Sequence, residues 1–480
     1  MSFIQLSDVS LSFGAQQVLS GCSATMYKGE RTALVGPNGC GKTTLLKILA
    51  GMAAPDSGTC YHPPGSTVYY LPQSGISHSG KSLYAEAETA FQPLHAQEAK
   101  MRELEVRMAK LTSSDSSTEK LVEQHHTIQE KLLEQGYYQR DEYIHRVLTG
   151  LGFSEKDFEC RTDQFSGGWQ MRIALAKALL THPDILLLDE PTNYLDIEAR
   201  TWLEDFFGSY SGGLMVVSHD RYFLDVTVNK VAELFQGMLR VYNGNYSAYK
   251  EVREKELEAL YAAYEKQQAE IAKHEDFIRR FRYNASKASL VQSRVKLLEK
   301  LERIQIPENM KTMHFHFPPA PRSGKIPVAL EGLSKSYGAK HVLSELNFEL
   351  ERGEKVVIAG VNGAGKTTLS RIVAGADCDY EGTVKYTSGV KIGYFAQNQE
   401  EHLDPEKTVL ETAEEDCPTE LFGQLKNLLG AFLFRGDDVE KKVGVLSGGE
   451  KSRLALLKLL LEPVNLLILD EPTNHLDMTS

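Results

Sequence analysis

The sequence predicts an α/β fold that is built twice along one chain, and three observations support this prediction. A glycine-rich segment, GPNGCGKTT, begins at Gly36 and returns as GVNGAGKTT at Gly360. Each segment follows an apolar run that is typical of a strand and precedes a helical pattern. Two further apolar runs, ILLLDE and LLILDE, end in paired carboxylates, the first at Asp189 and the second at Asp470. We therefore expect two P-loop nucleotide-binding domains in tandem, each with a strand, a glycine-rich loop and a helix.

The composition is that of a globular protein with two or three domains. The chain has 480 residues, of which 42% are hydrophobic and 25% are charged, and its net charge is −12. This balance argues against a uniformly basic surface, but not against a local basic one. The sequence has no apolar run long enough to span a bilayer, no secretory signal at its start and no CxxC pair among its six cysteines. We expect reduced thiols and a cytoplasmic protein, not a membrane, secreted or structural-zinc protein.

The first copy contains an insertion. The stretch between the glutamine that ends YLPQ or YFAQ and the following SGG motif is much longer in the first copy than in the second. Apolar residues recur at helical spacing on both sides of a turn-rich break, TSSDSST: Met101, Leu104, Met108, Leu111, Leu121, Ile128 and Leu132. We expect two antiparallel helices that form a projecting coiled-coil arm over about residues 82–135. The alternative is that these helices only thicken the domain, but their strongly polar remaining faces favour an arm.

A second helical region separates the two copies. We assign residues 1–246 to the first domain, 247–326 to a long helical linker and 327–480 to the second domain, whose start follows several prolines. Within residues 277–303 two acidic residues stand against eight basic ones: Arg279, Arg280, Arg282, Lys287, Arg294, Lys296, Lys300 and Arg303. Three of them, Arg280, Lys287 and Arg294, recur at every seventh position, which predicts one basic helical face. The alternative is a solvated charged helix that holds two domains apart.

The glycine-rich loops are the predicted ATP-binding segments, because their backbone N–H groups can wrap phosphates at a helix N-terminus. Lys42 and Lys366 would reach the β- and γ-phosphates, and the threonines that follow them would coordinate Mg²⁺. The predicted ATP-binding residues are Gly36, Pro37, Asn38, Gly39, Cys40, Gly41, Lys42, Thr43 and Thr44, and Gly360, Val361, Asn362, Gly363, Ala364, Gly365, Lys366, Thr367 and Thr368. A chance match is a poor explanation, because the motif occurs twice in the same context. Cys40 is better explained as a tolerated small residue than as a redox switch.

The paired carboxylates that end the apolar strands are the predicted catalytic groups. Asp189 and Asp470 suit the holding of Mg²⁺ through water, together with Thr43 and Thr367. Glu190 and Glu471 are placed to polarise an attacking water. The alternative is a strand end with solvated acids, and the P-loop upstream in each copy weakens it.

Three other kinds of side chain belong to the predicted sites. His219, in VVSHD, follows an apolar strand and is expected to contact the γ-phosphate; its counterpart in the second copy would fall beyond Ser480. Gln73 and Gln397 follow aromatic strands and are predicted metal ligands. Phe13 and Tyr337 stand at the same distance before the first glycine of their P-loops and could stack on adenine. For each aromatic residue on its own, a position in the hydrophobic core is a better explanation than stacking on adenine.

The motifs FSGGW and LSGGE lie between a P-loop and a carboxylate-ending strand, and they resemble the signature of ATP-binding cassettes. The resemblance implies that two cassettes pair within the chain, each signature facing the partner's P-loop. The signature residues are Ser166, Gly167 and Gly168 for the second P-loop, and Ser447, Gly448 and Gly449 for the first. Asp196 and Asp477 match the family's D-loop.

Further motifs narrow the resemblance to the ABC-F family. They are DEPTNYLD and DEPTNHLD with Asn193 and Asn474, the linker FRYNASKASLVQSRVKLLEKLE, and the arm. The segments FSGGWQMR, SHDRYFLD and GNYSAY resemble its YheS-like branch, which is similar to the eukaryotic Gcn-type factors. The resemblance implies a soluble, ribosome-associated ATPase that uses ATP and Mg²⁺ and has no stable membrane partner. It also implies that the linker meets ribosomal RNA and P-site tRNA, through Arg279, Arg280, Arg282, Lys287, Arg294 and Lys296.

Other functions stay open at this point. A fused ATP-binding subunit of an importer would need a membrane partner, and a DNA-repair ATPase would carry longer coiled coils or zinc modules. Translation control, ribosome assembly and antibiotic protection would all use the same cassettes. Family members continue past the second D-loop through a strand that carries a histidine. We therefore expect a C-terminally incomplete chain with an impaired second site.

Overall fold

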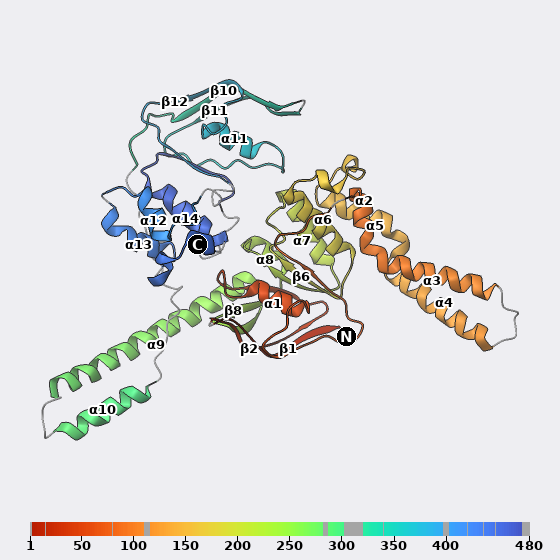
Figure 1. The fold of residues 1–480 in the computed structure, drawn as a ribbon, viewed down its shortest axis with the longest axis horizontal. Coiled ribbons are helices and arrows are strands. Elements are labelled where there is room, and N and C mark those ends of the chain that lie inside the picture. Colours follow the sequence, from red (N-terminus) through yellow and green to blue (C-terminus); the bar gives the residue numbers. More distant parts are fainter. Residues whose placement is uncertain are drawn as a thin grey trace. The chain divides into compact units, whose positions relative to one another are not determined.

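The computed structural model describes residues 2–14, 16–78, 80–109, 116–281, 287–301, 320–338, 340–396, 403–419, 421–434, 436–446 and 448–472 (Figure 1). The chain divides into two compact units. The first comprises Met1–Tyr246, Ser323–Gln397 and Leu466–Ser480, and the second comprises Ser247–Arg322 and Asn398–Asn465. The first unit therefore holds the first copy together with the P-loop segment of the second copy.

The first copy is built on a six-stranded sheet with the order β5-β6-β7-β3-β8-β9. Its strands are β3 (Arg31–Val35), β5 (Val68–Leu71), β6 (Ile185–Asp189), β7 (Gly213–Val217), β8 (Lys230–Phe235) and β9 (Met238–Asn243). All neighbours pair in parallel except β8 and β9. Every residue of β6 and β7 is buried, as parallel strands that are covered on both faces require. The predicted α/β class is confirmed.

An antiparallel sheet and several helices complete the core of this copy. The sheet has the order β2-β1-β4, with β1 (Phe3–Phe13), β2 (Gln16–Tyr27) and β4 (Ser57–Tyr61). Helix α1 (Lys42–Leu49) packs its buried Leu45, Leu46 and Ile48 against residues of both sheets. The helices that follow in this copy, outside the insertion, are η3 (Glu155–Asp157), η4 (Thr162–Gln164), α6 (Gly167–Leu180), α7 (Ile197–Ser209) and α8 (Arg221–Thr227).

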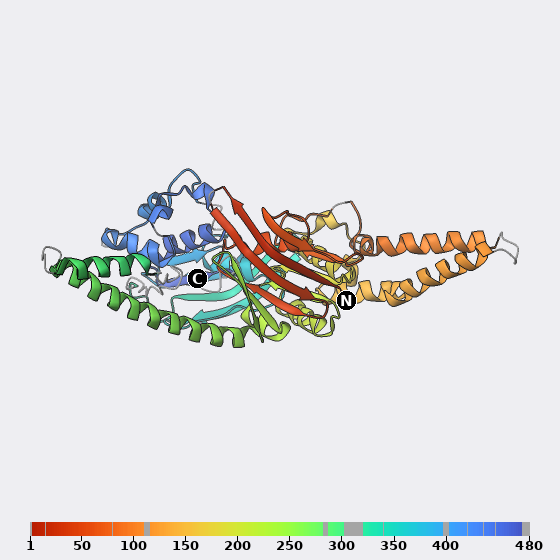
Figure 2. The ribbon, with the colours of Figure 1, turned by 90° about the horizontal axis from the view of Figure 1, so that it is seen from below.

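The segment between β5 and η3, which includes the insertion, is helical. It contains α2 (Leu83–Glu88), η1 (Thr89–Phe91), α3 (Gln92–Met108), α4 (Ser116–Glu134), η2 (Tyr137–Gln139) and α5 (Arg140–Gly150). Figures 1 and 2 show α3 and α4 side by side. Met101, Leu132 and Tyr137 are buried together, and Ile128 packs against them. Apolar residues at the predicted spacing thus supply this contact, while Leu111 lies outside the described residues.

The second copy contributes a smaller set of elements to the first unit. An antiparallel sheet has the order β11-β10-β12, and β13 pairs in parallel with β14. The elements are β10 (Val328–Tyr337), β11 (Lys340–Leu350), α11 (Lys366–Val373), β12 (Glu381–Tyr386), β13 (Ile392–Phe395) and β14 (Leu466–Leu469). Leu330, Leu333, Ile372 and Leu466 belong to their shared core.

One predicted strand is wrong. The segment VVIAG, residues 356–360, has no strand geometry, and Val357 is 89% exposed. In the first copy the equivalent strand β3 lies between β7 and β8 and pairs with both. No strand of the described residues pairs with residues 356–360, although their sequence is apolar.

The second unit is helical in its described part. It contains most of α9 (Tyr246–Phe281), α10 (Ala288–Lys300), α12 (Val409–Glu415), η8 (Phe422–Gln424), α13 (Leu425–Ala431), η9 (Gly436–Glu440), η10 (Val443–Val445) and α14 (Gly448–Leu461). Leu429, Phe434, Leu454 and Leu457 lie in the buried core that α13 and α14 share. Among the helices that the structure describes, none has the length and apolar character needed to cross a lipid bilayer.

The predicted single basic face of the linker is also wrong. Arg280 lies in the last turn of α9, Lys287 is the N-cap of α10, and Arg294 lies within α10. The guanidinium of Arg294 lies 3.9 Å from the centre of the Phe277 ring. On one straight helix, positions 277 and 294 would be about 25 Å apart. Helix α10 therefore turns back along α9, and the regular spacing does not place these cations on one face.

Candidate active site

The first P-loop joins β3 to α1. The N-cap Gly41 has a φ of 104°, which favours glycine. A methyl group at Gly36 would lie 2.3 Å from the carbonyl oxygen of Leu234, so the backbone passes too close to β8 for any side chain. The ammonium of Lys42 donates to the carbonyl oxygens of Gly36 and Pro37, at 2.8 and 3.0 Å. The loop thus curls around a lysine at the start of a helix, which is a binding geometry for phosphate.

The second P-loop repeats this geometry. Gly365 caps α11 with a φ of 96°. The ammonium of Lys366 donates to the carbonyl oxygens of Gly360 and Val361, at 2.7 and 3.0 Å. The two loops therefore match in their lysine contacts and in their cap glycines, as the repeated motif predicted.

A hydroxyl and a carboxylate meet at the predicted magnesium site of the first copy. The hydroxyl of Thr43 donates to Asp189 Oδ2 at 2.7 Å, and Asp189 is 3% exposed. Burial raises the pKa of this carboxyl, partly opposed by the hydrogen bond from Thr43. Gln73, the other predicted ligand, lies just after β5 and is exposed.

Tyr70 is a site residue that the sequence reasoning missed. Its hydroxyl donates to Asp189 Oδ2 at 3.4 Å, and burial and Asp189 raise its pKa. Tyr394 occupies the equivalent position in the second copy, and burial and then Asp470 raise its pKa as well. The signal was present in the sequence, because both YLPQ and YFAQ contain this tyrosine.

Glu190 and His219 form the predicted catalytic pair of the first copy. His219 Nε2 lies 3.3 Å from Glu190 Oε1, and the His219 backbone N–H donates to Glu190 Oε2 at 3.1 Å. Strand β7 ends next to β6, and this brings the histidine to the glutamate. Burial raises the pKa of Glu190 to about 7, which suits a general base near neutral pH.

Glu190 also has an unusual backbone. Its φ is 53°, in the left-handed region that a non-glycine residue seldom adopts, and Glu471 in the second copy has a φ of 49°. Asp470 is 6% exposed, and its Oδ2 accepts no hydrogen bond from the described residues. Gln397, Asn474 and Asp477 lie outside the described residues. The two glutamates therefore share a left-handed backbone as well as a place in the motif.

The signature motif of the first copy begins a helix. Ser166 is the N-cap of α6, and both Ser166 and Gly167 are exposed, so the first N–H groups of α6 can meet an anion. In the second copy α14 begins at Gly448, which is exposed, with Gly449 next in the helix. Ser447 lies outside the described residues.

The D-loop of the first copy meets the P-loop of the second copy within the first unit. The backbone N–H of Asn362 donates to Asp196 Oδ2 at 3.3 Å, and its side-chain amide donates to the Tyr194 carbonyl at 3.2 Å. Asp196 Oδ1 accepts from the N–H of Ala199 and so caps α7. Asn193 precedes this loop as the resemblance predicted.

The two aromatics before the P-loops are exposed. Phe13 is 61% exposed at the end of β1, and Tyr337 is 50% exposed at the end of β10. The core explanation is therefore wrong for both, and both rings can stack on a planar ligand.

The predicted RNA-binding residues divide into two groups. Arg279, Arg280 and Lys296 are exposed on α9 and α10, with Arg279 paired to Asp276 on its own helix. Lys287 is half-buried, and Arg294 packs on Phe277. Arg282 lies outside the described residues.

Together these groups fit a bound nucleotide with its metal ion. Each loop offers backbone donors and a lysine, and each copy has a threonine in its P-loop and a buried aspartate at the carboxyl end of a strand. Thr43 with Asp189, and Thr367 with the partly unsatisfied Asp470, are oxygen ligands of the kind that Mg²⁺ prefers. The left-handed glutamates stand next to these ligands. Fold and site define a P-loop protein made of two ATP-binding cassettes.

Comparison with known proteins gives the same class. The sequence matches the family described as ABC transporter over residues 19–193 and 343–474, and a second family with the same description over residues 232–317. It is 42% identical to the putative ATP-binding protein YdiF of Bacillus subtilis, over 100% of this chain and 75% of that protein. It is 37% identical to ABC transporter F family member 2 of Arabidopsis thaliana, over 100% of this chain and 71% of that protein.

A further relative and one solved structure extend the comparison. The probable ATP-binding protein YheS of Escherichia coli (strain K12) is 37% identical over 99% of this chain and 72% of that protein. The archaeal ribosome recycling factor aABCE1, solved with the ribosomal stalk protein aP1, has the same fold. That likeness has a TM-score of 0.58 at 20% identity, over 98% of this chain and 79% of the other. The chain belongs to the ABC-F family of ATP-binding cassette proteins, and it is an ATPase.

Proposed function

We propose that this ATPase acts on the ribosome, and that the α9–α10 hairpin is the part that engages ribosomal RNA and P-site tRNA. The observation that carries the proposal is the group of exposed cations on this hairpin, Arg279, Arg280 and Lys296, in a chain with a net charge of −12. Such a local basic surface suits the phosphate backbone of RNA. In this proposal residues 1–246 and 327–480 are the two cassettes, and residues 247–326 are the linker between them.

Family membership supports this proposal. The second matching family segment, residues 232–317, covers both helices of the hairpin. The relatives belong to the ABC-F family, and the recycling factor with the same fold was solved with a protein of the ribosomal stalk. We place the action in the cytoplasm, where ribosomes meet a protein with reduced thiols.

The chemistry assigns a role to each described group. Lys42 and Lys366 would neutralise charge on the β- and γ-phosphates. Glu190, with its pKa of about 7, would accept the proton of the attacking water, and His219 would hold this carboxylate and contact the γ-phosphate. Bound Mg²⁺ supplies charge neutralisation on the phosphates. The residues that would hold it are Thr43, Gln73 and Asp189 in the first copy and Thr367, Gln397 and Asp470 in the second.

ATP would act as a conformational switch. It binds between the cassettes, with the signature of one against the P-loop of the other, and so stabilises the closed pair. Closure would change the position of the hairpin relative to the tRNA site, and hydrolysis would release it. The same cycle would serve translation control, ribosome assembly or antibiotic protection.

The test is ribosome co-sedimentation of the Glu190→Gln/Glu471→Gln chain, with and without ATP, over a salt series. We expect ATP-dependent pelleting. Replacing Arg280 and Lys296 with glutamine should weaken pelleting and reduce the salt slope by about 2, because two phosphate contacts are lost. ATP affinity should stay unchanged.

The matched control removes two positive charges from α9. Lys250 and Lys255 pair with Glu254 and Glu251 on α9, so their replacement with glutamine should leave pelleting intact. Equal weakening by both double variants would refute the hairpin assignment. A chain that binds ATP and never pellets would refute the ribosome as the target.

A further inference from the structure

Arg172 is a buried arginine in the signature helix, and the chemistry described so far gives it no role. It lies in α6, whose N-cap is Ser166, and is 1% exposed. It is among the largest side chains that the protein buries completely. A buried charge is costly unless all its donors are used, so its partners define what it does.

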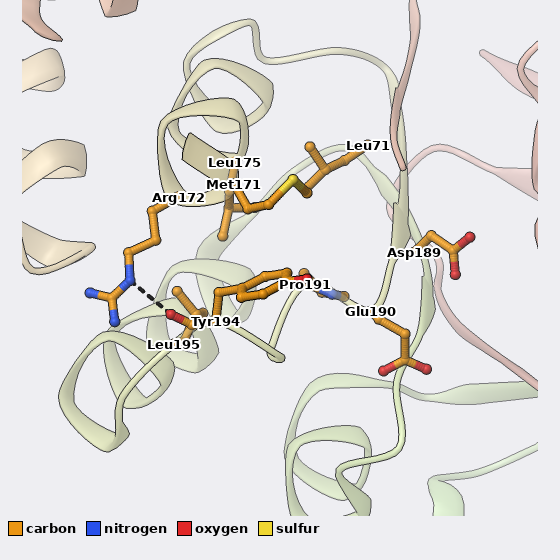
Figure 3. A pocket seen from close by; sticks show the side chains of 9 residues that line it. All are labelled: Leu71, Met171, Arg172, Leu175, Asp189, Glu190, Pro191, Tyr194 and Leu195. Carbon is orange, nitrogen blue, oxygen red and sulfur yellow. Dashed lines mark hydrogen bonds between the residues drawn. The ribbon is translucent and has the colours of Figure 1, made fainter. Parts of the chain in front are cut away.

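The guanidinium uses donors on all three of its nitrogens. Its Nε donates to the Tyr194 carbonyl at 2.8 Å, its Nη2 to Asp196 Oδ2 at 3.2 Å, and its Nη1 to the Leu151 carbonyl at 2.8 Å. Figure 3 shows the contact with Tyr194 across the pocket. Leu151 is the C-cap of α5, the helix that follows the arm. Arg172 thus joins the signature helix to the D-loop and to the end of α5.

Two of these acceptors are shared with the second copy. Asn362, in the second P-loop, donates its backbone N–H to Asp196 Oδ2 and its side-chain amide to the Tyr194 carbonyl. Arg172 and Asn362 therefore donate to the same two oxygens. A movement of the second P-loop that weakens the hydrogen bonds of Asn362 also changes the surroundings of the acceptors that Arg172 uses.

The surroundings leave the arginine little freedom. A methyl group at Gly152, where φ is 90°, would lie 2.7 Å from Arg172 Nη1. The guanidinium carbon lies 4.4 Å from the centre of the Trp169 ring, and Trp169 packs on the buried Phe153 at 4.9 Å. A shift of the guanidinium is therefore passed to Trp169 in the signature motif.

The same group lies near the catalytic carboxylates. Arg172, Tyr194, Asp189 and Glu190 line one pocket, together with Met171 (Figure 3). Tyr194 follows Glu190 closely on the segment that leads to the D-loop. Arg172 holds this segment, so a shift of the segment would also shift Glu190.

We propose that Arg172 is a positioning residue that couples the two ATP sites. Nucleotide binding at the second P-loop alters the contacts of Asn362 with Tyr194 and Asp196. Arg172 passes this change to Trp169 in the first signature motif and to the segment that carries Glu190. Hydrolysis at the first site then depends on the occupancy of the second P-loop. The inference concerns the ATPase itself and does not depend on the ribosome.

The second copy contains a matched residue. Arg453 occupies in α14 the position that Arg172 has in α6, is 8% exposed, and stands 5.9 Å from the ring of Phe434. Its Nε has no hydrogen-bond partner among the described residues, and its D-loop, within residues 473–480, lies outside them. Arg453→Lys is therefore the same substitution at the same helix position of the other copy.

The experiment uses Trp169 as its reporter. The chain has two tryptophans, so Trp202→Phe leaves Trp169 as the single one. Lys42→Ala in addition removes nucleotide binding at the first P-loop and leaves the second. In this background we expect ATP to change Trp169 emission with the same half-saturation as the binding of a fluorescent ATP analogue. Arg172→Lys should reduce the emission change about fivefold or more while analogue binding is kept. Arg453→Lys should leave it intact.

Asp196→Asn provides a second variant if Arg172→Lys does not fold, because it removes the carboxylate oxygen that accepts from both Arg172 and Asn362 and keeps an oxygen that caps α7. Loss of the emission change in this variant, with analogue binding kept, supports the proposal. Three results would overturn it. They are an unchanged response in Arg172→Lys, an unchanged response in Asp196→Asn (which would mean that the signature senses ATP directly), and equal losses in Arg172→Lys and Arg453→Lys.

Discussion

The hydroxyl of Thr43 lies 2.7 Å from a carboxylate oxygen of Asp189, although the two residues are 146 positions apart. Thr43 is in the first turn of α1, directly after the P-loop, and Asp189 ends β6. Strands β3 and β6 lie on either side of β7 in one parallel sheet, so both carboxyl ends open on the same edge. The sheet order alone brings the two predicted magnesium ligands together.

Thr43→Ala should raise the Mg²⁺ concentration that half-saturates ATPase activity by about tenfold, because an oxygen beside the metal site is lost. Thr43→Ser keeps the hydroxyl and is the matched control. Titration of Mg²⁺ at fixed ATP measures the effect. An equal shift in both variants would mean that the methyl group, not the hydroxyl, matters at this position.

Replacing Glu190 and Glu471 with glutamine should lower ATP hydrolysis by about 10²–10⁴-fold, because an amide cannot accept a proton from water. The fold and the P-loops are untouched, so ATP binding should remain. Single-turnover hydrolysis and equilibrium binding of ATP separate the two effects. If hydrolysis persists in the double variant, another group must be the base.

Tyr70→Phe should alter the Mg²⁺ dependence of hydrolysis, because its hydroxyl donates to Asp189 Oδ2. Tyr69→Phe is the control, since neighbouring residues of a strand point to opposite faces. We expect the half-saturating Mg²⁺ concentration to shift by a few fold in Tyr70→Phe alone, which is about the effect of losing one weak hydrogen bond. Titration of Mg²⁺ at fixed ATP measures this shift. Identical curves for the two variants would exclude a role for the Tyr70 hydroxyl.

Glu86 forms a buried ion pair at the start of the arm. Its Oε1 lies 2.5 Å from Lys177 Nζ in the signature helix and 3.1 Å from His78 Nδ1, and Glu86 is 8% exposed. Glu86→Gln should lower the free energy of unfolding by about 2 kcal/mol, because a charge-assisted hydrogen bond is lost. The control is Glu103→Gln, whose pair with Arg107 is exposed and is worth about 0.3 kcal/mol. Urea unfolding at pH 7 measures both.

The same pair predicts a pH dependence. Burial alone would raise the pKa of Glu86, but Lys177, His78 and Lys81 together hold it below its ordinary value of 4.5. A carboxyl with a lowered pKa stabilises the fold above its unfolded pKa and loses this contribution as pH falls. The stability difference between the wild type and Glu86→Gln should therefore shrink below pH 4.5. A constant difference across this range would show that packing, not charge, is lost.

Most of the first cassette could be predicted from the sequence, since its motifs are local. A glycine-rich loop between a strand and a helix needs no distant partner to be recognised, and β6 is apolar up to its final Asp189 because both its faces are covered. The residues that escaped prediction depend on distant contacts. Tyr70 meets Asp189 across 119 positions, and Arg172 meets Asn362 only through shared acceptors. The tyrosine repeated in YLPQ and YFAQ marks the first contact, but no local pattern encodes the second.

Two of the wrong expectations have one cause, the assumption that a sequence pattern forms without its neighbours. Residues 356–360 have the composition of a buried strand, but a strand also needs a partner to pair with. The regular spacing of Arg280, Lys287 and Arg294 implies one face only while the helix continues, and α9 ends at Phe281. A regular spacing of residues predicts that they share one face of a helix, but it does not predict where that helix ends.

The left-handed backbone of Glu190 and Glu471 has a consequence for evolution in the laboratory. A non-glycine residue in this conformation destabilises the fold by about 1–3 kcal/mol, and glycine relieves the strain. A library of variants that is selected for heat resistance should therefore enrich glycine at positions 190 and 471. Each such clone would survive heating and lose the carboxylate that hydrolysis needs. Selection for heat resistance therefore favours glycine at these two positions, and selection for ATP hydrolysis favours glutamate.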